Sequence, residues 1–385
     1  MNQNNITTWY NKKTFQQFSL ALVAFVICQI VLAVVLHYFG TDYFYAKNWA
    51  RNDSDHYLKI ATTGYELMPC AGLEGYALDS KEFCGNTAWF PGYPFLIYLV
   101  ASIFGNHLIV AGIISKIFYV LSLVFALKIM GVEKFNFRNL LLVLIPAFCF
   151  GFIYYNAIFP MSTLLFCVLV GIYFFLKDKP WHAGLFFFLA SFVYSTGFLL
   201  AVVFATYILF KNYKNFKVVI TKSFFPLLMG FLGVMSVFAL HQIMLGDWQA
   251  FSKVQAKYGH GFQSPIKNMG IFFKKPDFQN FDITHFIHYQ TFLVLAGFVL
   301  LTYFYIKNKM YQNTLYFLTY IYLFWYLFFP WLVGGDLSMY RAESMLLPFV
   351  FLLKETRTST LVIVLSFLLF IGIPMSYLFF TKVLI

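Results

Sequence analysis

Long uninterrupted apolar runs dominate the chain, and short polar segments that carry most of the charges separate them. Runs of about 18 or more residues predict helices that cross a membrane rather than the alternating strands of an outer-membrane barrel. The first run, Phe18 to Tyr38, exceeds the apolar region of a signal peptide and precedes no small-residue cleavage site, so we expect a retained helix. Seven further runs fit complete spans: Leu108 to Met130, Leu140 to Tyr155, Pro160 to Leu176, Phe224 to Leu245, Ile287 to Ile306, Thr314 to Val333 and Leu361 to Thr381.

Three other apolar regions are too short for comfortable complete spans. They suit half-helices or re-entrant segments packed inside protein. These regions are Tyr93 to Phe104, the pair Trp181 to Tyr194 and Gly197 to Phe210, and Ala342 to Leu353. The pattern therefore predicts an all-α polytopic membrane protein, a single domain over residues 1–385, with roughly 9 to 13 membrane segments.

Composition agrees with this class, since 61% of the residues are hydrophobic and only 11% are charged, unlike a water-soluble globule. The net charge of +12 first suggests a nucleic-acid partner. Lys12 and Lys13, however, favour a cytoplasmic N-terminus, and on that threading the inner side holds 15 Lys and Arg against 3 acids. The outer side holds 11 against 12. This positive-inside distribution leaves no basic stripe for nucleic acid.

The two long loops, residues 41–92 and 246–286, both fall on the extracytoplasmic side, so we expect the active site there, in a bacterial inner membrane or the endoplasmic reticulum. Cys70 and Cys84 share the first of these loops. In an oxidising compartment they would form a disulfide, and the alternative is that they are simply unpaired. No Cys or His spacing predicts a metal site. We expect no cofactor, with a divalent metal kept as an alternative because several acids share the first loop.

The densest polar cluster follows the first span, in residues 51–61. Asp53, His56 and Tyr57 have the i, i+3, i+4 spacing that places side chains on one face of a helix, and Gly64-Tyr65 would end that helix. Downstream, residues 88–94 read Ala-Trp-Phe-Pro-Gly-Tyr-Pro. Taken alone, this aromatic segment also fits an interfacial aromatic belt.

Together, the two segments resemble the GPI mannosyltransferase 2 (PIG-V-like) family of membrane glycosyltransferases, whose fold is called GT-C. In that family an Asp after the first helix precedes a His or similar residue, an aromatic, Gly-Tyr, and an Ala-aromatic-Phe-Pro return to the membrane. Weaker collinear similarity covers residues 155–162, 246–259 and 338–348. The chain departs from the family at Asn52, where an aromatic is usual, in residues 194–197, and in the order Tyr340-Arg341.

The resemblance implies a GT-C-like mannosyl- or hexosyltransferase that takes sugar from a polyprenyl- or dolichyl-phosphate donor. The acceptor hydroxyl would belong to a glycan, a lipid or a protein. An alcohol needs a base, and the resemblance selects Asp53 over Asp55 for an inverting transfer. The alternative interpretation of Asp53 is a helix cap paired with Arg51, or a solvated loop acid.

A phosphate leaving group needs cationic donors, and Arg341 is the candidate. Its alternative is an arginine that reaches the headgroups or pairs with Asp336 or Glu343. Further candidate phosphate contacts, which otherwise form a solvated amphipathic helix, are Gln255, Lys257 and His260. Candidate acceptor or donor contacts are His56, Asp55, Tyr57 and Trp89.

Two other classes of function stay open at this point. A transporter or flippase of lipid-linked sugars would move its substrate without chemical transfer, and such proteins place ionisable groups near the bilayer midplane. The spans here contain almost no acids away from their ends. A scaffold for other glycosyltransferases would tolerate substitution of Asp53 and His56.

Overall fold

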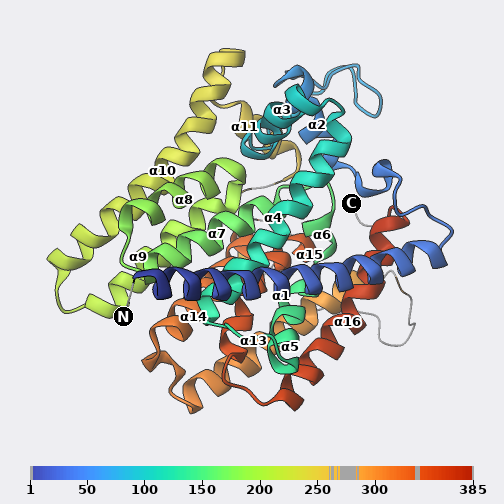
Figure 1. Cartoon of the computed structure of the whole chain (residues 1–385). Coiled ribbons are helices and arrows are strands. Elements are labelled where there is room, and N and C mark those ends of the chain that lie inside the picture. Colours follow the sequence, from blue (N-terminus) through green and yellow to red (C-terminus); the bar gives the residue numbers. More distant parts are fainter. Residues whose placement is uncertain are drawn as a thin grey trace.

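The computed structural model describes the backbone of residues 3–259, 261, 264–266, 268, 283, 286–333 and 339–383, and side chains from residue 13 onward. Helices make up nearly all of this structure (Figure 1). The longer ones are α1 (Gln3–Tyr38), α2 (Asp53–Thr63), α3 (Gly92–Phe104), α4 (His107–Met130), α5 (Phe137–Ala147), α7 (Met161–Leu176), α8 (Pro180–Val193), α9 (Leu199–Asn212), α10 (Phe216–Leu245), α13 (Phe286–Lys307), α14 (Thr314–Leu332) and α16 (Thr358–Phe380).

Short elements connect these helices. They are η1 (Ala46–Trp49), α6 (Ile153–Asn156), η2 (Ser195–Phe198), α11 (Ala250–Lys257), η4 (Met310–Gln312), α15 (Met339–Ala342), η5 (Glu343–Leu353) and a two-stranded antiparallel hairpin of β1 (Leu67–Pro69) and β2 (Phe83–Gly85). The expectation of an all-α architecture is confirmed apart from this hairpin.

Seven helices in the described part of the chain are long and apolar enough to cross a membrane. They cover Lys13–Tyr38, His107–Met130, Ser195–Asn212, Phe216–Leu245, Phe286–Lys307, Thr314–Leu332 and Thr358–Phe380. This is the architecture of a multi-pass integral membrane protein. Many of their side chains, such as Ile30, Phe231 and Val299, are exposed apolar groups that suit contact with lipid.

Shorter apolar helices fill the space between the long ones, and α8 packs against both α7 and α10. Three expectations from the apolar pattern are wrong here. The run Pro160 to Leu176 forms the 16-residue helix α7, which is not among the seven long helices, whereas Gly197 to Phe210, expected to be too short for a span, lies within one of them. The run Leu140 to Tyr155 is not one continuous helix, because α5 ends at Ala147 and α6 begins only at Ile153. Pro146 interrupts the hydrogen bonding of the last turn of α5, and Gly151 takes a positive φ of 63° in the connection.

The basic loops gather at one end of the bundle, here called the basic end. Lys13 forms an ion pair with Glu133, and Gln17 Nε2 donates to Val132 O at 2.7 Å. Arg138 Nη2 donates to Thr356 O at 3.1 Å. These contacts place the start of α1, the α4–α5 connection and the η5–α16 connection side by side.

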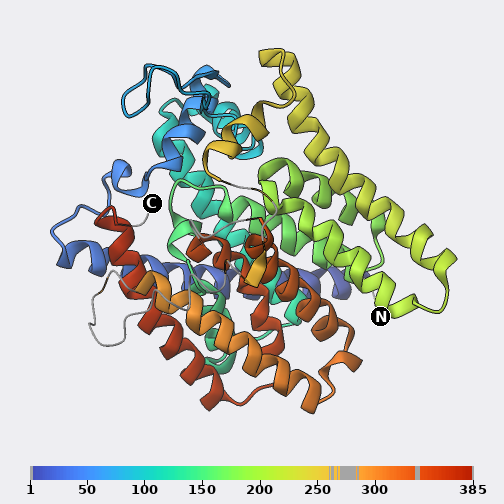
Figure 2. The same cartoon turned by 180° about the vertical axis from the view of Figure 1, so that it is seen from behind.

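The opposite end, here called the loop end, carries the residues that follow the first span. In Figures 1 and 2 the helices α2, α3 and α11 lie together at this end. The backbone N–H of Ile158 donates to Trp49 O at 3.0 Å. Arg51 Nε and Nη2 donate to Phe379 O and Phe380 O, both at 3.0 Å, and so satisfy free carbonyls at the end of α16.

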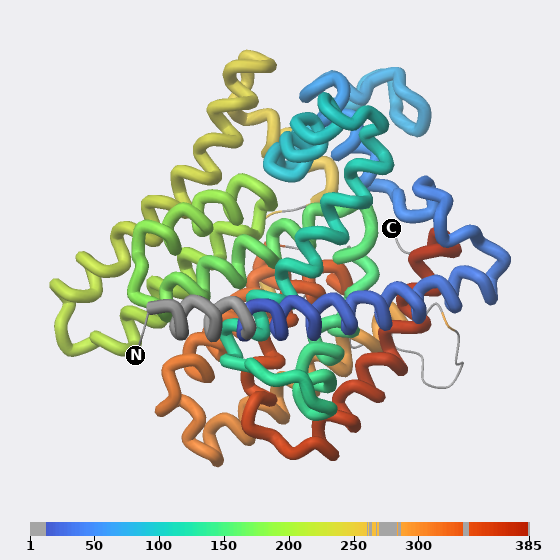
Figure 3. Tube along the Cα trace, in the orientation of Figure 1, coloured from blue at the N-terminus to red at the C-terminus, as the bar shows by residue number. Residues whose placement is uncertain are grey.

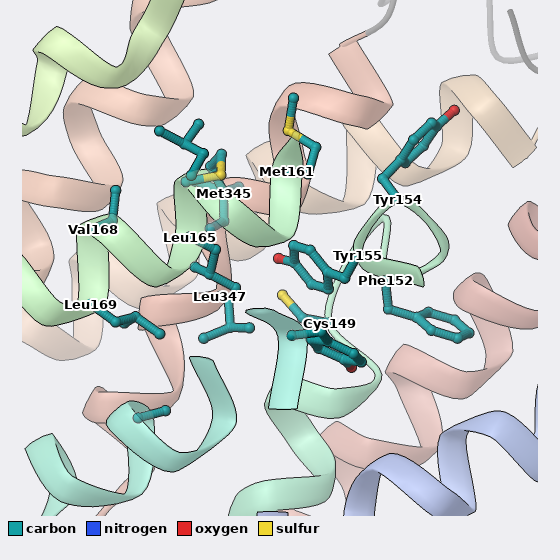
Figure 4. Packing of buried hydrophobic residues seen from close by; sticks show 14 of the residues in the cluster. Cys149, Phe152, Tyr154, Tyr155, Met161, Leu165, Val168, Leu169, Met345 and Leu347 are labelled. Atoms are coloured by element: carbon teal, nitrogen blue, oxygen red, sulfur yellow. The ribbon is translucent and has the colours of Figure 1, made fainter. Parts of the chain in front are cut away.

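The core joins segments distant in sequence. The trace in Figure 3 lets the reader follow how the C-terminal helix α16 passes beside α5, which it contacts. In Figure 4, Met161 and Leu165 of α7 lie beside Met345 and Leu347 of η5. All four side chains are at most 2% exposed. The Tyr155 hydroxyl donates to Ser344 O and ties η5 to the short helix α6. Packing therefore holds the C-terminal segment against the middle of the chain.

Gly92 allows α3 to approach α8, and this contact sets where the aromatic segment re-enters the bundle. A Cβ at position 92 would lie 2.7 Å from Val193 Cα. We predict that Gly92→Ala lowers the free energy of unfolding by about 1–3 kcal/mol, because backbone must move to relieve the contact. Thermal unfolding in detergent measures the effect. Gly112→Ala is the matched control, since a Cβ there meets nothing within 4 Å of it, and equal behaviour of the two variants would contradict the prediction.

Candidate functional site

An ion pair between Asp53 and Arg341 lies at the loop end of the bundle. Asp53 is the first residue of α2, and Arg341 belongs to α15. Arg341 Nη1 donates to Asp53 Oδ2. The side chains are 21% and 15% exposed, so both are largely withdrawn from water. The alternative pairing of Asp53 with Arg51 is wrong, because Arg51 binds carbonyls of α16. The alternative pairing of Arg341 with Glu343 is also wrong, because Glu343 binds Gln290. Asp336, the other alternative partner of Arg341, lies outside the described residues.

Aromatic side chains from separate segments surround the guanidinium. Its Cζ lies 5.6 Å from the centre of the Phe159 ring. Tyr194, Tyr57 and Tyr154 also interact with it electrostatically. Burial alone would lower the pKa of Arg341, but the Asp53 carboxylate, with these phenols, raises that pKa well above its usual range. Arg341 is therefore a permanent cation in a largely apolar setting.

Local contacts fix the start of α2. Asn52, with a φ of 34°, forms the sharp entry, a conformation that Asn tolerates better than most residues. Ser54 Oγ accepts from the backbone N–H of Arg51 at 3.0 Å and donates to Ile158 O at 2.9 Å. The helix ends before Gly64, which has a φ of 87°. Asp53 is thus held by a helix that is itself attached to the α6–α7 connection.

His56 and Trp89 bring the two conspicuous sequence segments together. Their rings stack with centres 3.6 Å apart and planes inclined by 18°. The Tyr65 hydroxyl donates to Trp89 O at 2.8 Å and fixes the tryptophan backbone. Tyr57 is buried, 1% exposed, and meets the edge of Tyr93 at 5.7 Å. The expected face of Asp53, His56 and Tyr57 therefore turns toward the protein.

Of the remaining candidates, Asp55 and Lys257 have other surroundings. Asp55 is exposed, on the side of α2 away from Tyr57. Lys257, at the end of α11, lies 3.7 Å (Nζ) from Cys84 Sγ and 5.1 Å from the centre of the Tyr76 ring. Gln255 is half-buried on the same helix, and His260 lies outside the described residues. The structure therefore places Lys257 against the first loop rather than against Arg341.

A disulfide joins Cys70 and Cys84 and closes the β1–β2 hairpin. Asn86 continues this link to α2, because its Nδ2 donates to Gly64 O at 3.1 Å and its Oδ1 accepts from Glu66 N at 2.9 Å. Thr87 Oγ1 donates to Ala250 O at 2.8 Å. The hairpin thus connects α2 to the start of α11.

Sequence reasoning missed several residues of the site. Phe159 lies in a segment of weak similarity, Tyr194 in a segment that departs from the family, and Tyr154 in the short helix α6, yet all three interact with Arg341. Glu343, 1% exposed, accepts from Gln290 Nε2 at 2.7 Å, and the same amide donates to Tyr340 O at 3.2 Å. Glu343 was expected only as an alternative partner of Arg341, and its position inside the apolar run 342–353 was the signal that it would need a partner within the protein.

Two cavities of about 350 and 410 Å³ lie at the basic end, and neither is lined by a residue of this site. In the part of the chain that the structure describes, no group of three or more His, Cys, Asp or Glu side chains is arranged to hold a metal ion. No protein-family model matches the sequence, and no curated protein matches it. The proposed function therefore rests on the geometry of the site around Asp53 and Arg341.

Because His56 is stacked on Trp89, we predict that the stability of the folded protein depends on pH. Burial lowers its pKa below the ordinary 6.5, and Lys257 acts in the same direction, against the opposing charges of Asp53 and Asp55. The unfolded chain therefore binds the proton more readily, so stability present above about pH 6.5 is lost as the pH falls below that value.

We expect the melting temperature in detergent to fall more between pH 7.5 and pH 5.5 for the wild type than for His56→Phe, which keeps a ring against Trp89 but does not titrate. All other titrating groups are common to both proteins. The same pH response in both would show that His56 is not held in its neutral form.

Proposed function

We propose that this chain is an integral membrane glycosyltransferase that transfers a mannosyl or other hexosyl group from a polyprenyl- or dolichyl-phosphate donor to an acceptor hydroxyl, with inversion. The observation that carries the proposal is the contact of Asp53 with Arg341, a carboxylate and a cation placed together at the loop end of the bundle. The resemblance to the PIG-V-like family supports the same assignment, with a GT-C-like arrangement of the helices.

Asp53 serves as the general base. An acceptor hydroxyl attacks the anomeric carbon only as its proton is removed, and a carboxylate within hydrogen-bond reach can take that proton. Arg341 occupies Oδ2 of the carboxylate, which leaves Oδ1 for the acceptor. Since the departing phosphate is stable as an anion, transfer needs no second carboxylic acid, unlike most glycoside hydrolysis.

Arg341 serves as the seat of the donor phosphate. Its guanidinium has several N–H donors, and its interaction with Asp53 uses Nη1. Charge on the phosphate grows as the glycosidic bond breaks, so a fixed cation with little water around it stabilises the transition state more than the ground state. The aromatic groups near Arg341 supply that environment.

Inversion places the base and the leaving phosphate on opposite faces of the sugar. A donor positioned this way would separate two side chains that now touch, so Asp53 competes with the donor phosphate for Arg341. Substitutions of the base and of the phosphate-binding residue should therefore differ in their effects on turnover and on donor binding. Substituting Asp53 removes turnover while leaving Arg341 to bind the donor, whereas substituting Arg341 removes both.

The sidedness of the charges supports an extracytoplasmic site. The basic end gathers the short Lys- and Arg-rich connections, including Lys13, Arg138 and Lys354, whereas Asp53 and Arg341 lie at the loop end. Basic loops favour the cytoplasmic side, which puts the loop end outside. The Cys70–Cys84 disulfide, on that same end, suits an oxidising compartment.

We predict that Asp53→Asn lowers transfer by roughly 10²- to 10⁴-fold, the usual contribution of a general base, while donor binding equals or exceeds that of the wild type. We expect Arg341→Ala to lose both transfer and donor binding, and Arg341→Lys to retain part of the donor binding. The assay supplies a panel of polyprenyl-phosphate sugars to protein in proteoliposomes and measures acceptor labelling, donor hydrolysis and donor binding.

Asp79→Asn provides the matched control, because it removes one negative charge from an exposed position in the same loop. Wild-type transfer by Asp53→Asn would rule out the base assignment. Movement of labelled lipid-sugar across the bilayer, with no transfer by any variant, would instead identify a flippase.

A further inference from the structure

A basic cavity of about 350 Å³ lies far from the candidate site, at the basic end of the bundle. Phe125 and Lys128 of α4, Tyr173 and Phe174 of α7, and Lys177 and Lys179 of the α7–α8 connection line it. Three lysines thus line a space that is also bounded by aromatic residues. The proposed transfer reaction uses none of them.

The aromatic residues that line this cavity pack against other rings. The Phe125 and Tyr173 rings meet edge to face at 5.6 Å, and Phe174 contacts His182 of α8 at 5.0 Å. Lys128 Nζ lies 4.9 Å from the centre of the Phe125 ring, and Lys177 Nζ lies 6.0 Å from that of Tyr173. The ammonium groups of Lys128 and Lys177 therefore lie near aromatic rings beside the cavity.

None of the ion pairs among the described residues involves Lys128, Lys177 or Lys179. Asp178 is exposed on the connection between two of them. By contrast, Lys13 at the same end of the bundle is paired with Glu133. The cavity consequently carries an excess of positive charge that an anion would balance.

We propose that this cavity binds the phosphate headgroup of an anionic phospholipid from the cytoplasmic leaflet. Basic pockets between helices on that side suit anionic headgroups, and each Lys near the surface adds attraction. Apolar surface continues from the cavity along α4. Ile113 and Ile117 are about half exposed, and Ile117 precedes Lys128 by eleven residues, about three helical turns, so the two lie on the same helix face. Trp181, 74% exposed, follows Lys179 at the level expected for an interfacial anchor.

This apolar surface favours a lipid over a soluble phosphate. A headgroup bound by the lysines would place its acyl chains along Ile117 and Ile113, where lipid already surrounds the protein. A free phosphate or nucleotide would gain the charge interaction but nothing from that surface. The source of the phosphate is therefore distinguishable by experiment.

The test compares full-length protein in neutral detergent with added phosphatidylglycerol, phosphatidylcholine or inorganic phosphate. Native mass spectrometry counts bound lipid, and the melting temperature reports stabilisation. We expect phosphatidylglycerol to bind and to raise the melting temperature. The triple variant Lys128→Gln, Lys177→Gln, Lys179→Gln should bind it about tenfold or more weakly, given the attraction contributed by each lysine.

The control variant Lys214→Gln, Lys217→Gln, Lys222→Gln removes the same charge from exposed lysines at the start of α10 and before it, none of which lines the cavity. It should bind phosphatidylglycerol like the wild type. The proposal is overturned if both triple variants lose binding equally, if the cavity variant binds normally, if phosphatidylcholine binds as well as phosphatidylglycerol, or if inorganic phosphate stabilises the wild type to the same extent.

A second measurement does not require the triple variant to fold. Brominated acyl chains of phosphatidylglycerol should quench the fluorescence of the wild type more than that of Trp181→Phe. Equal quenching would place the lipid elsewhere. Failure of the glycosyltransferase proposal would leave both results unchanged, because this cavity and the Asp53–Arg341 site lie at opposite ends of the bundle.

Discussion

The Asp53–Arg341 ion pair is the constraint on which the loop end of this molecule depends. It joins side chains 288 positions apart, both largely withdrawn from water. A guanidinium in such a setting needs a partner, and removing one member of a well-buried pair costs about 3–5 kcal/mol. The ion pair therefore favours the arrangement in which the first loop meets the C-terminal segment.

Three anchors bring the members of the pair together. Ser54 ties α2 to Ile158, Arg51 ties the preceding turn to the end of α16, and Gln290 holds Glu343 and the carbonyl of Tyr340 beside Arg341. Each anchor satisfies a polar group that would otherwise be buried alone. The same contacts that stabilise the fold thus preorganise a carboxylate base and a phosphate-binding cation, which the proposed transfer reaction requires.

The sequence predicted what depends on local pattern. Apolar runs gave the helical architecture, and the spacing of Asp53, His56 and Tyr57 gave the face of α2. The run from Leu140 to Tyr155 was wrongly predicted as one helix, because its apolar pattern continues through Pro146 and Gly151, where the helix is interrupted. Tyr194 and Phe159 could not be assigned to the site, since only tertiary packing brings them to Arg341. The partner of Asp53 was likewise a long-range contact that helical periodicity does not encode.

The most direct test of the central claim is a cryo-EM structure of the protein in a lipid nanodisc with a non-transferable polyprenyl-phosphate sugar analogue. The account predicts the analogue's phosphate on the guanidinium of Arg341, the anomeric carbon between that group and Asp53, and the ion pair opened. Density for the analogue elsewhere, with Asp53 still bound to Arg341, would contradict it.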